Sequence, residues 1–183
     1  MRLIGSFLLA CVVHHAPAGD FILKRPREFY KAVPPGAKIQ RLVTGFKFTE
    51  GPQWMPGGNG HLIFSDIPAD RLIKWTVRGG AITFRRPSRN ANGNTLDRQG
   101  RLVTCEHGAR RVSITDAKGN VQTLVDSFDG KKFNSPNDLA IRSDGTIWFT
   151  DPSYGLRGRK AEAGGKWVYR LKSDGSVSVA CKT

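Results

Sequence analysis

An internal repeat with a period in the low forties constrains the fold of this chain more than any other feature. Three polar segments open the repeats, Glu50-Gly51-Pro52, Asn92-Gly93-Asn94 and Asn137-Asp138, at intervals of 42 and 45 residues. About eight to ten residues later each repeat has a glycine turn and an apolar strand pattern, which reads HLIFSD, RLVTCEH or TIWFTD. Two further short runs complete each repeat: RLIKWTV and AITFRR, RRVSITD and NVQTLVD, KWVYRLK and SVSVAC. Four short antiparallel strands per repeat are typical of a propeller blade, so an all-β fold is expected.

Composition agrees with many short strands. The chain has 21 glycines and 10 prolines among 183 residues, with an ordinary 39% of hydrophobic residues, which favours tight turns over long helices. Residues 19–36, with three prolines, are expected to form an extended leader. Residues 37–183 are expected to form a partial propeller, in which AKIQRLV supplies a single closing strand before blades one to three.

The first 18 residues are interpreted as a cleaved signal peptide. Arg2 precedes an apolar run from Leu3 to Val13, and Ala16-Pro17-Ala18 offers small residues for cleavage. The run is too short to span a membrane. A secreted or periplasmic location follows. The alternatives are a buried N-terminal element or a lipoprotein acylated at Cys11.

The number of cysteines and the net charge limit the disulfide bonds and the binding partners that this chain can have. Without Cys11, only Cys105 and Cys181 remain, which is too few for a disulfide framework. Both are expected to be small buried strand residues, with a single bridge as the alternative. The net charge is +14, which attracts anionic substrates. The basic clusters are scattered and lack interleaved aromatic residues, so they are interpreted as solvated faces and no nucleic-acid partner is expected.

Polar side chains at the starts of the inner strands define the candidate site. The inner strand of each blade begins near the central channel, so Glu50, Asn92 and Asn137 are expected to point toward one axial site, with Asp138 beside them. Carboxylate and amide oxygens suit a hard cation such as calcium. The alternatives are a solvent-facing turn carboxylate for Glu50 and turn-capping amides for Asn92 and Asn137.

The ends of the second strands carry further polar residues, namely Asp66, Glu106-His107 and Thr150-Asp151. His107 and Asp151 are additional site candidates. His107 is a candidate proton carrier if it reaches the channel, and otherwise a hydrogen-bonded structural residue. Asp66 and Asp151 have capping of turns as an equal alternative.

Three motifs, FTEGPQW, NGNTLDRQGRLVTCEHG and SPNDLAIRSDGTIWFTDPSYGL, resemble the SMP-30/gluconolactonase/luciferin-regenerating-enzyme family, in particular its bacterial gluconolactonase-like branch. The resemblance implies a six-bladed β-propeller that holds a divalent cation, calcium or zinc, and hydrolyses lactones or esters. Glu50 matches the family's metal-binding glutamate. Asn137 matches an asparagine that lies beside the ion and contacts substrate or its water, while Asn92 and Asp138 occupy substrate-facing positions by analogy.

The resemblance also implies ligands that this chain does not show: an asparagine opening the fourth blade, and an aspartate opening the fifth that serves as general base. Both are expected beyond Thr183. The chain is therefore expected to be a C-terminally truncated copy of a metal-dependent sugar-lactone hydrolase with impaired or no activity. Self-association through the uncovered blade is one alternative, and a non-catalytic propeller module that binds a ligand or protein is another.

Overall fold

The structure is a computed structural model that describes residues 26–34 and 36–182. It divides into two compact units, residues 1–44 and 45–183, which are considered separately. The expected signal peptide, including Cys11, lies outside the described residues. Within the described ranges, none of the helices has the length and apolar character needed to cross a membrane.

The first unit contains one helix among its described residues, α1 (Pro26–Ala32). It begins at a proline, has Glu28 in the first turn and Lys31 in the last, an order that suits the helix dipole. The expected extended leader is therefore wrong over these residues. The expected closing strand over 37–43 is also wrong: this segment is irregular and Ile39 is 64% exposed. No described segment pairs with it, so its backbone groups have no ladder to join.

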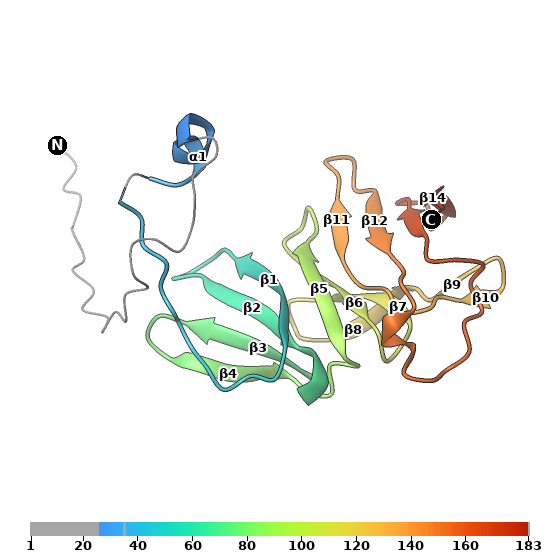
Figure 1. The fold of residues 1–183 in the computed structure, drawn as a ribbon, viewed down its shortest axis with the longest axis horizontal. Coiled ribbons are helices and arrows are strands. Elements are labelled where there is room, and N and C mark those ends of the chain that lie inside the picture. Colours follow the sequence, from blue (N-terminus) through green and yellow to red (C-terminus); the bar gives the residue numbers. More distant parts are fainter. Residues whose placement is uncertain (1–25, 35, 183) are drawn as a thin grey trace. The chain divides into compact units, whose positions relative to one another are not determined.

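The second unit is built from three four-stranded antiparallel sheets, in each of which the spatial order of strands follows the chain (Figure 1). Blade one contains β1 (Thr49–Met55), β2 (His61–Asp66), β3 (Arg71–Thr76) and β4 (Gly80–Arg85). Blade two contains β5 (Ala91–Leu96), β6 (Leu102–Glu106), β7 (Arg111–Thr115) and β8 (Val121–Val125). Blade three contains β11 (Leu139–Ile141), β12 (Ile147–Thr150), β13 (Val168–Leu171) and β14 (Val177–Cys181). The all-β propeller class and its three blades are confirmed.

Short elements connect the blades. A ribbon of β9 (Ser127–Phe128) and β10 (Lys131–Lys132) lies between blades two and three in the sequence. Two 3-10 turns follow second strands: η1 (Ile67–Ala69) after β2, and η2 (Tyr154–Leu156) after β12. Both turns end in a residue with left-handed backbone, Asp70 and Arg157 respectively. They carry the chain from the second strand toward the third.

The hydrophobic core lies between neighbouring blades. Blades one and two bury Ile63, Leu72, Ala91 and Leu102. A larger cluster joins blades two and three, with Val103, Cys105, Val112, Ile114, Val125, Phe133, Ile147, Phe149, Tyr169 and Leu171. Alternate residues of each strand point to one face, so β6 supplies Val103 and Cys105 while β12 supplies Ile147 and Phe149. This packing fixes the blades against each other and thereby the starts of their inner strands.

The opposite face of blade one is less covered. In β1, Trp54 pairs with Leu62 and therefore lies on the face opposite to Ile63, which packs toward blade two. The Trp54 side chain is 49% exposed. The two cysteines differ in burial: Cys105 is buried in β6, as expected, whereas Cys181 is exposed on β14. Both are free, and the expectation for Cys181 fails because β14 is the outer strand of its sheet.

Candidate functional site

The inner strands of the three blades begin next to one another. The Asn94 side-chain nitrogen donates to the carbonyl oxygen of Gly51 over 2.9 Å, which ties β5 to the start of β1. The backbone nitrogen of Gly93 donates to the carbonyl oxygen of Asn137 over 2.8 Å, which ties β5 to the segment before β11. The structure thus places Glu50, Asn92 and Asn137 at the starts of three inner strands, of which the first contacts the second and the second contacts the third.

Glycines make this close approach sterically feasible. A Cβ at Gly51 would lie 2.2 Å from the carbonyl oxygen of Asn92, and a Cβ at Gly93 would lie 2.4 Å from a carboxylate oxygen of Asp138. Both inner strands also have an irregular register at this point, between Glu50 and Gln53 in β1 and between Ala91 and Asn94 in β5. Bulges redirect side chains locally and recur near active sites, so blades one and two open with the same device, whereas β11 of blade three pairs with β12 in regular register.

The second strands end where the inner strands begin. Thr49 pairs with Asp66, and Ala91 pairs with Glu106, so the ends of β2 and β6 lie beside the starts of β1 and β5. His107 directly follows β6 and reaches this end of blade two. The sequence alone did not decide whether His107 reaches this end, because the answer depends on the lengths of the strands.

His107 connects two of the candidate amides. Its Nε2 atom lies 3.1 Å from the side-chain nitrogen of Asn92 and 3.3 Å from that of Asn137. His107 is 6% exposed and Asn92 is 7% exposed. An amide NH2 group can only donate, so both contacts require that Nε2 accept. The two asparagines come from different blades and meet at one ring nitrogen.

The surroundings of His107 keep the imidazole neutral. Burial, followed by the charges of Arg157 and Arg159, lowers the pKa of His107 from 6.5 to about 4. The Arg159 guanidinium also donates to the backbone oxygens of His107 and Gly108, each over 2.9 Å. Gly155 in η2 packs on the ring, since a Cβ there would lie 2.7 Å from Cγ and Nδ1 of His107. The ring is therefore neutral at neutral pH, with a single ring proton, and Gly155 and the Arg159 contacts to the adjacent backbone hold it in place.

Glu50 and Asp138 are exposed at the same end. Among the described contacts, Glu50 takes part in no ion pair or side-chain hydrogen bond, so its carboxylate remains available. Asp138 is held by its own loop, because its carboxylate accepts from the backbone nitrogen of Leu139 over 2.9 Å. Its backbone nitrogen lies 3.2 Å from the hydroxyl of Thr150.

The carboxylates that end the second strands are fully buried. Asp151 accepts hydrogen bonds from the backbone nitrogens of Asn134 and Ser135, over 2.8 and 2.7 Å. Asp66 accepts from the backbone nitrogens of Lys47 and Phe48, over 3.1 and 3.3 Å. Each carboxylate thus holds the segment that leads into the inner strand of its own blade.

The buried carboxyl groups differ in their electrostatic surroundings. Burial raises the pKa of Asp151 from 3.8 to about 6, and the two backbone hydrogen bonds offset only part of this effect. Glu106 is instead surrounded by cations: it pairs with Arg85 of blade one over 3.1 Å and with Arg111 over 2.7 Å. Glu106 therefore forms an ion pair that joins blade two to blade one.

Several residues at this end were not singled out from the sequence. Asn94 is buried, and its side-chain nitrogen lies 2.9 Å from Gly51 O, Ser65 Oγ and Asn92 O. Arg159 and Gly155 support His107 from a loop of blade three. The one signal for Asn94 was its place in the repeated opening segment. Nothing in the sequence linked 155–159 to His107, because their contact is tertiary.

The donor chemistry at this end fits a hard cation. No group of three His, Cys, Asp or Glu side chains that could hold a metal occurs in the described part of the chain. The arrangement offers instead the carboxylate of Glu50 and the side-chain oxygens of Asn92 and Asn137, whose nitrogens face His107, while the Asp138 carboxylate at the same end accepts from its own loop. Oxygen donors of this kind are the ligands that calcium prefers.

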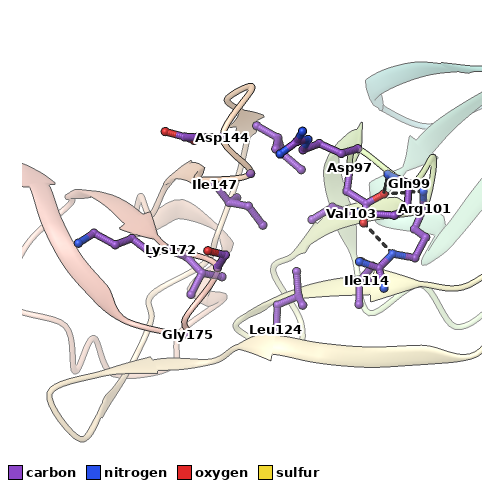
Figure 2. Close-up of a pocket in the computed structure, with 15 residues that line it drawn as sticks. Asp97, Gln99, Arg101, Val103, Ile114, Leu124, Asp144, Ile147, Lys172 and Gly175 are labelled. Atoms are coloured by element: carbon purple, nitrogen blue, oxygen red, sulfur yellow. Dashed lines mark hydrogen bonds and ion pairs between the residues drawn. The ribbon is translucent and has the colours of Figure 1, made fainter.

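A separate cavity of about 390 Å³ lies at the opposite end of blades two and three (Figure 2). It is bordered by the β5–β6, β11–β12 and β13–β14 turns. Figure 2 shows side chains of Val103 and Leu124 from blade two and Ile147 from blade three around the space between the blades. Asp97 on its rim is paired with Arg101 over 2.7 Å. Since these turns are at the far ends of the strands from Asn92 and Asn137, the cavity is not part of the candidate site.

Comparison with known proteins agrees with this architecture. A gluconolactonase of Zymomonas mobilis is 33% identical over 159 residues, covering 77% of this chain and 44% of the relative. The structure of gluconolactonase XC5397 from Xanthomonas campestris superposes with a TM-score of 0.77 at 36% identity, covering 84% of this chain and 54% of that one. A crystal structure from a gluconolactonase protein family gives a TM-score of 0.80 at 40% identity, covering 87% and 57%.

A more distant structure shares the fold alone. The calcium-binding protein regucalcin from Agrobacterium tumefaciens has a TM-score of 0.53 at 20% identity. The chain spans about half the length of the relatives it matches. The model of the SMP-30/gluconolactonase/LRE-like region matches residues 48–182, which include all three blades. The chain therefore belongs to the SMP-30/gluconolactonase/LRE-like family.

Proposed function

We propose that this chain contributes to a metal-dependent hydrolase that opens sugar lactones, in the manner of the gluconolactonases it resembles. The observation that carries the proposal is the meeting of Asn92 and Asn137 at His107, next to the start of β1 with its exposed Glu50. This leaves oxygen donors from three blades at one end of the unit. Identity of 33% and 36% to two gluconolactonases supports the choice of lactones.

The roles of the residues follow from their chemistry. The Glu50 carboxylate and the Asn137 side-chain oxygen are metal ligands. Asn92 and Asp138, with Asn137, contact the lactone through its hydroxyl groups. A bound divalent cation, calcium by preference and zinc as the alternative, supplies a Lewis acid that polarises the lactone carbonyl. The carboxylate that activates water is not assigned to a residue of this chain.

Charge at the site and over the whole chain acts on the lactone carbonyl and on the acid product. With Glu50 as its one carboxylate ligand and neutral amides as the others, a bound divalent cation would keep net positive charge and would attract an electron-rich carbonyl. The whole chain is also strongly basic, with 29 basic and 15 acidic residues. A positive field raises the local concentration of anions, so it attracts the sugar acid that hydrolysis releases.

The proposal is tested by lactone hydrolysis and cation binding on the purified chain. Hydrolysis of glucono-lactone is followed by titration of the released acid, with calcium and after chelation. Calcium binding is measured by isothermal titration calorimetry. Glu50→Ala is expected to abolish both signals, whereas Glu28→Ala, which removes an exposed glutamate from α1, leaves both unchanged.

Two results would count against the proposal. Hydrolysis that is insensitive to chelator and to Glu50→Ala would remove the metal from the reaction. Absence of calcium binding to the purified chain would instead remove the metal site formed by Glu50 and Asn137.

A further inference from the structure

His107 offers one acceptor to two amide groups. In a neutral imidazole one ring nitrogen donates and the other accepts. The described contacts of Nε2 are to the side-chain nitrogens of Asn92 and Asn137, over 3.1 and 3.3 Å. If one amide alone turned over, its oxygen lone pair would face the lone pair of Nε2, whereas a ring protonated at Nε2 would face both side-chain oxygens. The two amides therefore share one orientation, and in the observed one both side-chain nitrogens face Nε2, so each side-chain oxygen points away from the ring.

The contacts around the ring come from blade three as well as blade two. Arg159 donates to the backbone oxygens of His107, Gly108 and Gly155, over 2.9, 2.9 and 3.2 Å. The Gly155 backbone lies against the imidazole, and Tyr154 presents its ring edge-on at 6.3 Å between centroids. A ring enclosed in this way has little freedom to rotate away from the two asparagines.

We infer that His107 is a positioning residue, whose Nε2 lone pair holds the amide nitrogens of Asn92 and Asn137 so that their side-chain oxygens face the cation and the lactone. The inference rests on the proposed function for the identity of what the oxygens face. It assigns His107 a different role from that of a proton carrier, because the ring nitrogen on the site side is occupied by two donors. It also links cation binding to the packing of blade three on blade two.

The first test needs neither metal nor substrate. Nitrogen-15 NMR of the full chain reports which ring nitrogen of His107 carries the proton. The expected result is protonation at Nδ1 and an unprotonated Nε2 at neutral pH. In His107→Leu, the side-chain amide resonances of Asn92 and Asn137 should shift and broaden as the amides lose their common acceptor. A ring protonated at Nε2 would overturn the inference.

The second test measures calcium affinity by calorimetry. His107→Leu removes the acceptor, and outer-shell changes of this kind weaken metal binding by about 10–100-fold. His107→Gln places a side-chain oxygen near the position of Nε2, so its affinity should stay within about threefold of wild type, since an acceptor remains. His61→Leu is the matched control, because His61 lies at the far end of blade one and should not change the affinity.

A third variant reaches the ring without changing it. Gly155→Ala would place a methyl group 2.7 Å from the imidazole and 2.6 Å from Cβ of Ser135, which crowds the ring and should weaken calcium binding while His107 is intact. Circular dichroism and the unfolding midpoint verify that each variant is folded. If folded His107→Leu binds calcium as tightly as wild type, the positioning role is wrong.

Failure of the proposed function is recognised separately. A wild-type chain that binds no divalent cation contradicts the proposed metal site, and the NMR measurement still decides the orientation of the amides. A wild-type chain that binds calcium, together with a His107→Gln variant as weak as His107→Leu, contradicts the positioning role alone.

Discussion

The backbone nitrogen of Gly93 donates a 2.8 Å hydrogen bond to the carbonyl oxygen of Asn137, which joins the inner strand of blade two to the segment that opens blade three. The contact requires a residue without a side chain, because a Cβ at Gly93 would lie within 2.4–2.8 Å of Asp138 and Asn137 atoms. The absence of a side chain at Gly93 therefore allows the segments that contain Asn92 and Asn137 to lie this close together.

Gly93→Ala is expected to separate these segments. Overpacking of this kind costs about 1–3 kcal/mol of unfolding free energy, and calcium affinity should fall together with it, because Asn137 moves away from Asn92. Urea denaturation and calorimetry measure the two effects. Gly79→Ala is the control, since the new methyl group meets only the flexible hydroxyl of Thr76 in an exposed turn. Equal stability of the two variants would show that blade three adjusts without cost.

Aromatic packing between blades two and three makes a second prediction. The Phe149 ring lies 5.1 Å from that of Phe133 and 5.5 Å from that of Tyr169, and all three are fully buried. Phe149→Ala should lower the unfolding free energy by about 3–5 kcal/mol, because it leaves a cavity. Tyr154→Ala, at a residue that is 71% exposed, should change it by less than about 0.5 kcal/mol. Denaturant titration distinguishes the two.

The ion pair between Arg85 and Glu106 makes a third prediction, because it crosses from blade one to blade two. Glu106 is fully buried, while the Arg85 side chain is 13% exposed. Arg85→Ala should lower the unfolding free energy by about 2–3 kcal/mol. This is less than the roughly 3–5 kcal/mol expected for a buried charge left without any partner, because Arg111 still pairs with Glu106. Arg142→Ala breaks an exposed pair with Asp144 and should cost less than about 1 kcal/mol. A similar loss in both variants would contradict a special role for the buried pair.

The repeat and the strands of this chain were predictable from sequence because their signals are local. Alternating apolar residues between glycine turns placed HLIFSD on β2 without error, and the other second, third and fourth strands within two residues. The prediction of an extended leader was wrong because it relied on the prolines, whereas Pro26 begins a helix with the sequence PREFYKA. The closing strand over 37–43 failed for another reason: a strand pattern forms a strand only if a partner exists.

The site was predictable only in part. The repeated openings indicated Glu50, Asn92 and Asn137, and the structure brings their segments together. The contacts of His107 were not predictable, since Asn137 is 30 residues away and Arg159 is 52 residues away. The roles of Asp66 and Asp151 also needed coordinates, because capping of the preceding segment and exposure to the channel have the same sequence pattern.

Asp151 makes the fourth prediction, a pH dependence of stability. Burial raises its pKa to about 6 in the folded chain, above the ordinary value of 3.8. The folded protein then binds more protons than the unfolded chain between these values, so the carboxyl group contributes stability at low pH that is lost as the pH rises through about 6. At 1.36 kcal/mol per pKa unit the loss amounts to about 3 kcal/mol.

Asp151→Asn isolates this effect. The unfolding free energy of the variant is lowered by an amount that does not depend on pH, because its NH2 group faces one of the backbone nitrogens of Asn134 and Ser135. The unfolding free energy of wild type minus that of the variant should therefore fall between about pH 4 and pH 7. Asp144→Asn is the control of opposite sign: a hydrogen bond from the Thr146 backbone lowers the pKa of Asp144, so its contribution is lost as the pH falls. Because both variants remove one carboxyl group, an Asp151 difference curve that is flat or rises with pH would mean that the Asn134 and Ser135 nitrogens stabilise the buried carboxylate at least as strongly as burial penalises it.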